Sequence, residues 1–253
     1  MKLILVANWK NHPSSLKEAS AILAGMSKKV KSYKKLSTFI APPATYLGLV
    51  SEKGKSLGTL ASQDIFFSPG RETYTGVITP DILKSFGVKL TIIGHSERRR
   101  LGETNQVVAE KVQTALVAGI TPLVCIGEET HDQEGHYFEF LSAQLKASLE
   151  GIHRRSDAAK IAIAYEPVWA IGKKGKDAMQ PGELAQVVIF IKKVLTEIFG
   201  REAAEGMPIL YGGSVEPINA KALLKDTGAR GLLVGHASLD AKSMNAIAEA
   251  LIN

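Results

Sequence analysis

The chain has 253 residues, 45% hydrophobic and 22% charged, a composition that fits a globular protein and excludes a disordered or fibrous one. No apolar run is long enough to span a membrane, and Asn8 and Lys10 interrupt the apolar start too early for a signal peptide. The formal net charge of +6 favours anionic ligands, among them small phosphorylated metabolites, nucleic acids and acidic membranes, without choosing between them.

Two features of the sequence limit the classes of binding partner and the cellular compartment. Lysines between residues 28 and 35 lie at the end of an amphipathic helical pattern, so we interpret them as a solvated helix terminus and expect no nucleic-acid partner. The single cysteine, Cys125, excludes an internal disulfide and predicts a cytoplasmic protein. It has no adjacent cation or second cysteine, so a buried structural thiol is favoured over a nucleophile.

Eight short runs of β-branched and apolar residues predict strands. In chain order they cover residues 3–7, 37–41, 58–62, 89–93, 121–126, 160–165, 208–211 and 231–234. The stretches between them carry apolar residues at helical spacing, for example Val107, Val108, Val112, Ala115 and Leu116, or Leu184, Val187, Val188, Ile191 and Leu195.

Alternating strands and helices require parallel strands with helical crossovers. Eight such units in this length predict an α/β fold, a single (β/α)8 barrel. A doubly wound sheet is the alternative, but no Gly-x-Gly-x-x-Gly turn follows the first strand. No linker or composition shift divides the chain, so residues 1–253 are predicted to form one domain. The long irregular stretches 63–79 and 167–181 are expected to be functional or interfacial.

In a closed parallel barrel the carboxyl ends of all strands open on one face, so residues far apart in sequence meet there. The rule brings together Asn8, Lys10, Gln63, His95, Glu97, Cys125, Glu166, residues 212–214 and Gly235. Glu166 ends an apolar strand before a long loop and is a candidate base. An isolated glutamate at a strand end is more often hydrated or paired with a lysine. The other polar residues expected on the same face favour a catalytic role for Glu166.

His95 precedes a predicted helix that Ser96 is expected to cap, with Glu97 complementing the positive helix end. The N–H groups there disfavour imidazolium, so the ring is expected to be a neutral donor; the alternative is a structural histidine. Lys10 offers a fixed positive charge or is a surface lysine. Glu97 either holds Lys10 as an ion-pair partner or serves the helix terminus alone.

Glycines in the loops 211–215 and 233–238, after the last two strands, let backbone N–H groups approach an anion and indicate a barrel phosphate site. No Walker motif is present. The six histidines form no metal-binding spacing, and His131 and His136 are interpreted as polar-face residues near a helix start, so no metal is expected.

Six motifs occur in the order of one known family. They are Asn8-Trp9-Lys10, residues 94–99 (GHSERR), residues 125–128 (CIGE), residues 165–172 (YEPVWAIG), residues 211–215 (YGGSV) and residues 233–235 (LVG). The chain resembles the triosephosphate isomerases from its first strand to its last. The resemblance implies a cofactor-free isomerase that interconverts dihydroxyacetone phosphate and glyceraldehyde 3-phosphate, small phosphorylated trioses.

By the same resemblance, Glu166 moves a proton between adjacent carbons, and His95 polarises the carbonyl, a pairing established for this enzyme family. Lys10 stabilises negative charge, Asn8 positions substrate and Glu97 supports them. The resemblance assigns phosphate binding to backbone groups at Gly172, Ser214, Gly235 and His236, and lid closure to residues 167–178, again an established behaviour of the family.

The chain departs from the family pattern at four places. The lid, residues 172–181, is two residues longer than is common, and His236 replaces a second glycine of the last phosphate loop. Asn11-His12 and Val77 replace Met-Asn and a glutamate at the expected subunit contact. The resemblance implies a homodimer in which Thr75 crosses to the partner's site. Phe66 and Phe67 either anchor that loop in the partner or pack beneath their own loop.

The residues taken by themselves do not exclude two other functions. One is a catalytically weak phosphosugar-binding or scaffolding protein on the same barrel, whose lengthened lid no longer closes productively. The other is a different barrel enzyme acting on a phosphorylated sugar, since fold alone does not determine chemistry. The presence of all the central polar groups, in the family's order, favours the isomerase.

Overall fold

The computed structural model describes residues 2–26, 30, 33–67, 73–173 and 179–252. Eight parallel strands form a closed barrel in which each strand pairs with the next and the last pairs with the first. The strands are β1 (Leu3–Asn8), β2 (Leu36–Ala41), β3 (Thr59–Ser62), β4 (Leu90–Ile93), β5 (Thr121–Ile126), β6 (Ala162–Tyr165), β7 (Ile209–Tyr211) and β8 (Gly231–Val234).

The predicted strands and the (β/α)8 barrel are confirmed, with strand ends differing from the prediction by at most two residues. Closure between β1 and β8 pairs Val6 with Leu233 and Ala7 with Val234. The barrel interior is filled rather than hollow, because side chains such as Val6, Leu123 and Leu210 are fully buried there. This packing forms a rigid support beneath the carboxyl ends of the strands.

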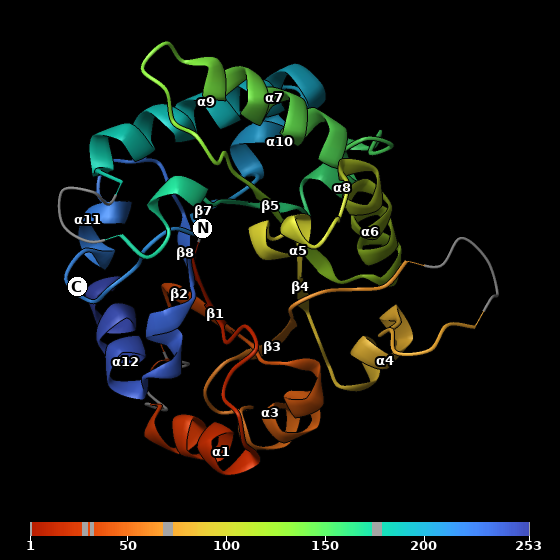
Figure 1. Cartoon of the computed structure of the whole chain (residues 1–253), viewed down its shortest axis with the longest axis vertical. Helices are drawn as coiled ribbons and strands as arrows, with labels where there is room; N and C mark the ends of the chain where they lie inside the picture. The colour runs from red at the N-terminus through yellow and green to blue at the C-terminus, as the bar shows by residue number, and fades with distance from the viewer. Residues whose placement is uncertain (1, 27–29, 31–32, 68–72, 174–178, 253) are drawn as a thin grey trace.

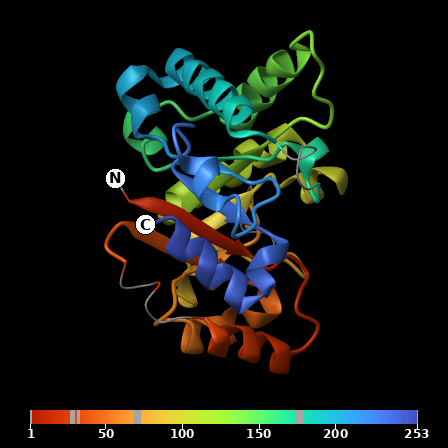
Figure 2. The same cartoon turned by 90° about the vertical axis from the view of Figure 1, so that its left-hand side faces the viewer.

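Helices surround the strands, and Figures 1 and 2 place α7 and α9 on one side of the barrel and α1 and α12 on the opposite side. The helices are α1 (Leu16–Gly25), α3 (Leu47–Lys53), α4 (Pro80–Ser85), α5 (Ser96–Arg100), α6 (Asn105–Ala118), α7 (His136–Ser148), α8 (Arg155–Ala158), α9 (Pro181–Phe199), α10 (Arg201–Gly206), α11 (Ala220–Leu224) and α12 (Ala241–Ala250), with 3-10 turns η1 (Ala44–Tyr46), η2 (Val168–Ala170) and η4 (His236–Leu239).

The two helices predicted from apolar spacing are α6 and α9. Thr104 caps α6 by accepting a hydrogen bond from the Val107 N–H at 3.3 Å, and Gly119 ends it at φ 73°, where glycine is unstrained. Proline at position 181 begins α9, and the residues of the face predicted to be apolar are buried. Within the described residues, none of the helices has the length and apolar content needed to cross a membrane.

The aromatic pair after β3 packs within its own loop. The ring centroid of Phe66 lies 5.6 Å from that of Phe67 and 4.9 Å from that of Tyr74, and both phenylalanines are half-buried. Of the lysines predicted to form a solvated helix end, those at 28, 29 and 31 lie outside the described residues. Cys125 is buried and unpaired, as expected of a structural thiol, and burial raises the pKa of its thiol well above the ordinary value.

Candidate active site

A cavity of about 210 Å³, the catalytic cavity, opens at the carboxyl ends of the strands. It brings together most of the predicted site residues. Its lining is Asn8, Lys10, His95, Glu166, Ile171, Gly172, Lys173, Gly212, Gly213, Ser214, Val215, Glu216, Leu233, Gly235, His236 and Ala237. Of the predicted set, Glu97 lines a neighbouring cavity instead, and Thr75 is exposed and lines neither.

Glu166 follows β6 and is 1% exposed. Its backbone N–H donates to the Ile126 carbonyl at 2.8 Å, which extends the pairing of β6 with β5 past the strand end. The side chain points towards the start of α5: Oε2 accepts from the Ser96 N–H at 2.9 Å, and Oε1 lies 2.8 Å from Nε2 of His95. A buried carboxylate that follows β6 and an imidazole that follows β4 are therefore in contact, although β5 lies between the two strands.

The charge state of Glu166 follows from this contact. Burial raises the pKa of the carboxyl, but the charge and hydrogen bonding of His95, together with the Ser96 N–H, outweigh burial and hold the pKa below its ordinary value of 4.5. The carboxylate is therefore ionised at neutral pH. An ionised carboxylate, rather than a neutral acid, is what a proton-abstracting base requires.

His95 occupies the N-cap position of α5, and its Nδ1 accepts a hydrogen bond from the Glu97 N–H at 3.2 Å. The prediction that Ser96 caps this helix is wrong, because the helix begins at Ser96 and the imidazole one residue earlier takes the capping role. A nitrogen that accepts a hydrogen bond carries no proton, so we assign the neutral tautomer with its proton on Nε2.

Burial is the largest single influence on His95 and lowers its pKa, but the charge and hydrogen bonding of Glu166, together with the charge of Glu97, outweigh burial and raise the pKa above its ordinary value of 6.5. Taken alone, that direction favours imidazolium, in conflict with the hydrogen bond accepted at Nδ1. The neutral form agrees with the geometry, because a second ring proton would point at the Glu97 N–H. One proton shared between Nε2 and the carboxylate accounts for both observations, and the pair titrates as a unit.

A reciprocal pair of substitutions tests this coupling. Glu166→Gln is expected to lower the pKa of His95, because the charge that raises it is removed. His95→Gln is expected to raise the pKa of Glu166 above 4.5, because burial then dominates, so the carboxylate protonates at higher pH than in the parent protein. Carbon and nitrogen NMR titrations of labelled residues measure both shifts. Unchanged midpoints in both variants would contradict the coupling.

Lys10 has a backbone φ of 52°, an uncommon conformation for a residue other than glycine. Two side chains hold it there. Oδ1 of Asn8 accepts from the Lys10 N–H at 3.0 Å, and Nε2 of Gln63 donates to the carbonyls of Lys10 at 2.8 Å and of Ala41 at 2.9 Å. Gln63 was predicted only as a strand-end polar residue, and its positioning role depends on a contact between separate strands.

The ammonium of Lys10 forms an ion pair with Oε1 of Glu97 at 2.6 Å. Oε2 of the same glutamate lies 3.7 Å from Nδ1 of His95. Of the two interpretations weighed for Glu97, the ion pair with Lys10 is present in the structure. Glu97 thus connects the cation to the imidazole while remaining partly exposed to solvent.

The loops after β6, β7 and β8 form the opposite wall of the cavity. Ser214 Oγ accepts from the Gly172 N–H at 2.8 Å and donates to the Ala170 carbonyl at 3.1 Å, so it joins the start of the lid to the loop after β7. A Cβ on Gly213 would lie 2.2 Å from Oη of Tyr211, so only glycine fits there. Residues 174–178 of the predicted lid lie outside the described residues.

Two charged residues near the site, one buried and one half-buried, were not assigned roles from the sequence. Glu128 is 2% exposed, and its Oε1 accepts from Tyr165 Oη at 2.8 Å and Trp169 Nε1 at 2.7 Å and lies 3.1 Å from Nδ1 of His131. The His131 ring stacks on Tyr137 with centroids 3.9 Å apart, so the prediction that it lies on a polar face is wrong. Glu128 thereby holds the segment that starts the lid.

Arg99 is the second. Its guanidinium donates to the carbonyls of Gly94 at 2.7 Å and Cys125 at 3.2 Å, and to side-chain oxygens of Asn105 at 2.6 Å and Ser148 at 3.1 Å. These bonds fix the turn that carries His95. The only signals in the sequence were the charged residues within the GHSERR and CIGE motifs.

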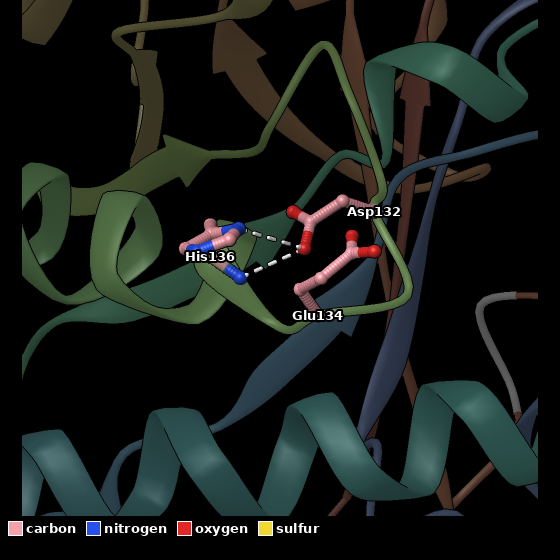
Figure 3. Close-up of side chains that lie close together, drawn as sticks. All are labelled: Asp132, Glu134 and His136. Carbon is pink, nitrogen blue, oxygen red and sulfur yellow. Dashed lines mark hydrogen bonds and ion pairs between the residues drawn. The ribbon is translucent and has the colours of Figure 1, made fainter.

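One surface group in the described residues has side chains close enough together to hold a metal ion: Asp132, Glu134 and His136. Figure 3 shows the Asp132 carboxylate facing His136, with Glu134 beside it. Asp132 already accepts from the N–H groups of His136 at 2.9 Å and Tyr137 at 3.0 Å, at the start of α7. Helix capping accounts for the cluster, which is separate from the catalytic cavity.

A larger cavity of about 920 Å³, the lateral cavity, is lined by Lys10, His95 and Glu97 at one end and by residues of the loop after β3. At its base Lys111, 3% exposed, forms ion pairs with Asp64 at 2.6 Å and with Glu103. Burial raises the pKa of Asp64 against the opposing effect of Lys111. Exposed apolar side chains border this cavity, including Leu101, which is 84% exposed.

A closed parallel barrel whose strand ends gather a carboxylate, an imidazole and an ammonium group beside glycine-rich loops defines the class of (β/α)8-barrel enzymes. The family model of triosephosphate isomerase matches residues 3–251, and the chain belongs to this family.

Curated relatives agree. The chain is 41% identical over 247 residues to the triosephosphate isomerase of Geobacter metallireducens, covering 96% of each protein. It is 40% identical over 250 residues to that of Dehalococcoides mccartyi, covering 97% of this chain and 96% of the relative. It is 38% identical over 240 residues to that of a Thermoanaerobacter species, covering 93% and 94%.

Proposed function

We propose that this chain interconverts dihydroxyacetone phosphate and D-glyceraldehyde 3-phosphate through an enediolate, with Glu166 as base and His95 as electrophile. The observation that carries the proposal is the 2.8 Å contact between the buried Glu166 carboxylate and Nε2 of His95 in a cavity that also contains Lys10 and the glycine-rich loops. Family membership supports the reaction, and the geometry supports the roles that we propose for the residues.

Glu166 must move before it reacts. Both of its oxygens face α5, where one accepts from the Ser96 N–H and the other contacts His95. Gly212 leaves room for the movement, since a Cβ there would lie 2.9 Å from Cγ of Glu166. Rotation about the side-chain bonds would exchange the Ser96 contact for the substrate carbon.

The proton transfers follow once Glu166 has rotated towards the substrate. The carboxylate takes a proton from the carbon beside the carbonyl, the electron pair of the broken C–H bond forms a double bond between the two carbons, and the π pair of the carbonyl moves onto its oxygen. Nε2–H of His95 donates to that oxygen and, by giving and regaining its proton, moves hydrogen between the two oxygens. Glu166 then returns its proton to the adjacent carbon. Lys10 lowers the energy of the intermediate by its charge, and Asn8 holds the substrate beside it.

The phosphate group of the substrate would bind at the other wall. Backbone N–H groups around Gly172, Ser214, Gly235 and His236 are the proposed donors, because these residues line that wall together. Closure of the lid, residues 167–178, would exclude water, which strengthens these contacts and protects the enediolate. Binding energy from the remote phosphate then contributes to organising the reacting groups.

The alternative of a catalytically weak phosphosugar-binding or scaffolding protein is not favoured, because the relatives and the family model point to the enzyme. A coupled assay separates the two. We expect the protein to convert dihydroxyacetone phosphate to glyceraldehyde 3-phosphate with no added cofactor or metal. Binding of the substrate without turnover would contradict the enzyme and support the binding protein.

We further propose that residues 1–253 act as one domain in a cytoplasmic homodimer, with Thr75 entering the partner's site. Exposed Leu101 beside the lateral cavity supports a subunit contact there.

Sedimentation equilibrium is expected to give twice the chain mass of 27.2 kDa. Leu101→Lys is expected to shift the population towards monomer, because it buries a charge in the contact. A matched change at exposed Val117, on α6, should leave the mass unchanged. A monomeric parent protein would contradict the proposal.

A further inference from the structure

We call the wall formed by the loops after β6, β7 and β8, where the substrate phosphate is proposed to bind, the phosphate wall of the catalytic cavity. It contains a titratable side chain at the end of the last strand. His236 is exposed, begins η4 directly after Gly235, and lines the cavity together with Lys10 and Ser214. Among the described residues only Lys10 and Asp226 combine a positive φ with a side chain, so the backbone at position 236 accommodates histidine without strain. The ring therefore lies at the wall without disturbing the loop.

Two lysines lie at this wall together with His236. A Cβ on the preceding Gly235 would lie 3.2 Å from Cε of Lys10, so the loop after β8 and the ammonium group are close neighbours. Lys173 lines the cavity from the lid, with its ammonium 5.8 Å from the centroid of the Trp169 ring. Both lysines add positive charge to this wall of the cavity, and positive charge favours binding of a dianion.

The acidic residues of this region are Glu166, Glu216 and Asp240. Glu166 lies at the inner end of the cavity in contact with His95. Glu216 lines the cavity from the loop after β7, and Asp240 at the end of η4 accepts from the Ser243 N–H at 2.8 Å, which helps to lower its pKa. Lys174, Lys176 and Asp177 of the lid lie outside the described residues.

We propose that the His236 ring, in its protonated form, binds the phosphate group of the substrate directly, so that the affinity of the site for a dianion increases as the pH falls. The inference rests on the proposed function, which places the phosphate at this wall. Binding a dianion beside the ring takes up a proton wherever the free ring is neutral. The added affinity is complete where the ring is already charged and disappears as rising pH removes its proton.

Sulfate is a suitable probe because it remains a dianion throughout the relevant pH range, whereas a phosphate monoester changes charge near pH 6. Sulfate affinity is measured by titration calorimetry at constant ionic strength from about pH 5.5 to about pH 8.5, the range in which histidine titrates. The proteins are the parent chain, His236→Asn, which keeps a polar side chain, and His236→Gly, which keeps only the backbone donor. His153→Asn is the matched control, because His153 is an exposed histidine outside the cavity.

The parent protein and His153→Asn are expected to lose about two- to fivefold more sulfate affinity across this range than either His236 variant, the scale of one exposed ion pair. Calorimetry in buffers of different ionisation enthalpy should show proton uptake that the His236 variants lack. Parallel affinity profiles in all four proteins would overturn the proposal. If the parent protein is an active isomerase but the sulfate-affinity profiles are parallel, only the proposed role of His236 is contradicted, and the proposed reaction stands. Steeper profiles in a protein without isomerase activity contradict the proposed reaction but support the histidine contact.

Discussion

Glu166→Asp is expected to lower kcat for dihydroxyacetone phosphate by about a hundredfold, because a carboxylate displaced by one methylene no longer reaches the reacting carbon. KM is expected to change little, since the role proposed for Glu166 is at the reacting carbons and not at the phosphate group. Steady-state rates in both directions, measured by coupled assay, give the two parameters. The loss belongs to the chemical step, so a primary isotope effect on the transferred hydrogen should remain visible in the variant.

The matched control for this substitution is Glu52→Asp, the same change at an exposed residue of α3. It is expected to keep the parent kcat. Equal turnover by Glu166→Asp and the parent protein would remove Glu166 from the role of base. Because Glu166 is buried, a substitution there could also destabilise the protein. Thermal unfolding of each variant is therefore measured, to show that the decrease in kcat does not result from unfolding.

Lys10→Met is expected to lower kcat/KM by about a hundredfold or more, because it removes the fixed charge near the developing oxyanion. Methionine has similar length and lacks the ammonium group, and it keeps the backbone strain of the parent at φ 52°. The same change frees Glu97 from its ion pair, leaving a carboxylate 3.7 Å from Nδ1 of His95. We therefore also expect NMR titration to show a rise in the pKa of His95 in this variant.

Lys53→Met, at the exposed end of α3, is the control and should retain parent kinetics. A loss of affinity with unchanged kcat in Lys10→Met would assign Lys10 to substrate binding alone. If Lys10→Met were as active as the parent protein, Lys10 would have no role in the reaction.

The sequence predicted the barrel well because every strand is a short apolar run, and such runs separated by helical spacing admit few arrangements. The convergence of Asn8, Lys10, His95 and Glu166 followed from the barrel rule alone. His95 capping its own helix did not follow, because the capping preference for serine is a statistical tendency and the ring competes with it locally. The roles of Gln63, Glu128 and Arg99 depend on partners from other strands, which spacing does not reveal.

The seam between β1 and β8 also has consequences for how the protein is made. Ser238 Oγ donates to the Asn8 carbonyl at 3.1 Å across 230 positions of the chain, and Gly235 lies beside Lys10. During translation, the groove that would receive a triose is therefore unfinished until nearly the whole polypeptide has left the ribosome. Nascent chains ending before β8 expose the open edges of β1 and β7, so they are the species most in need of chaperones.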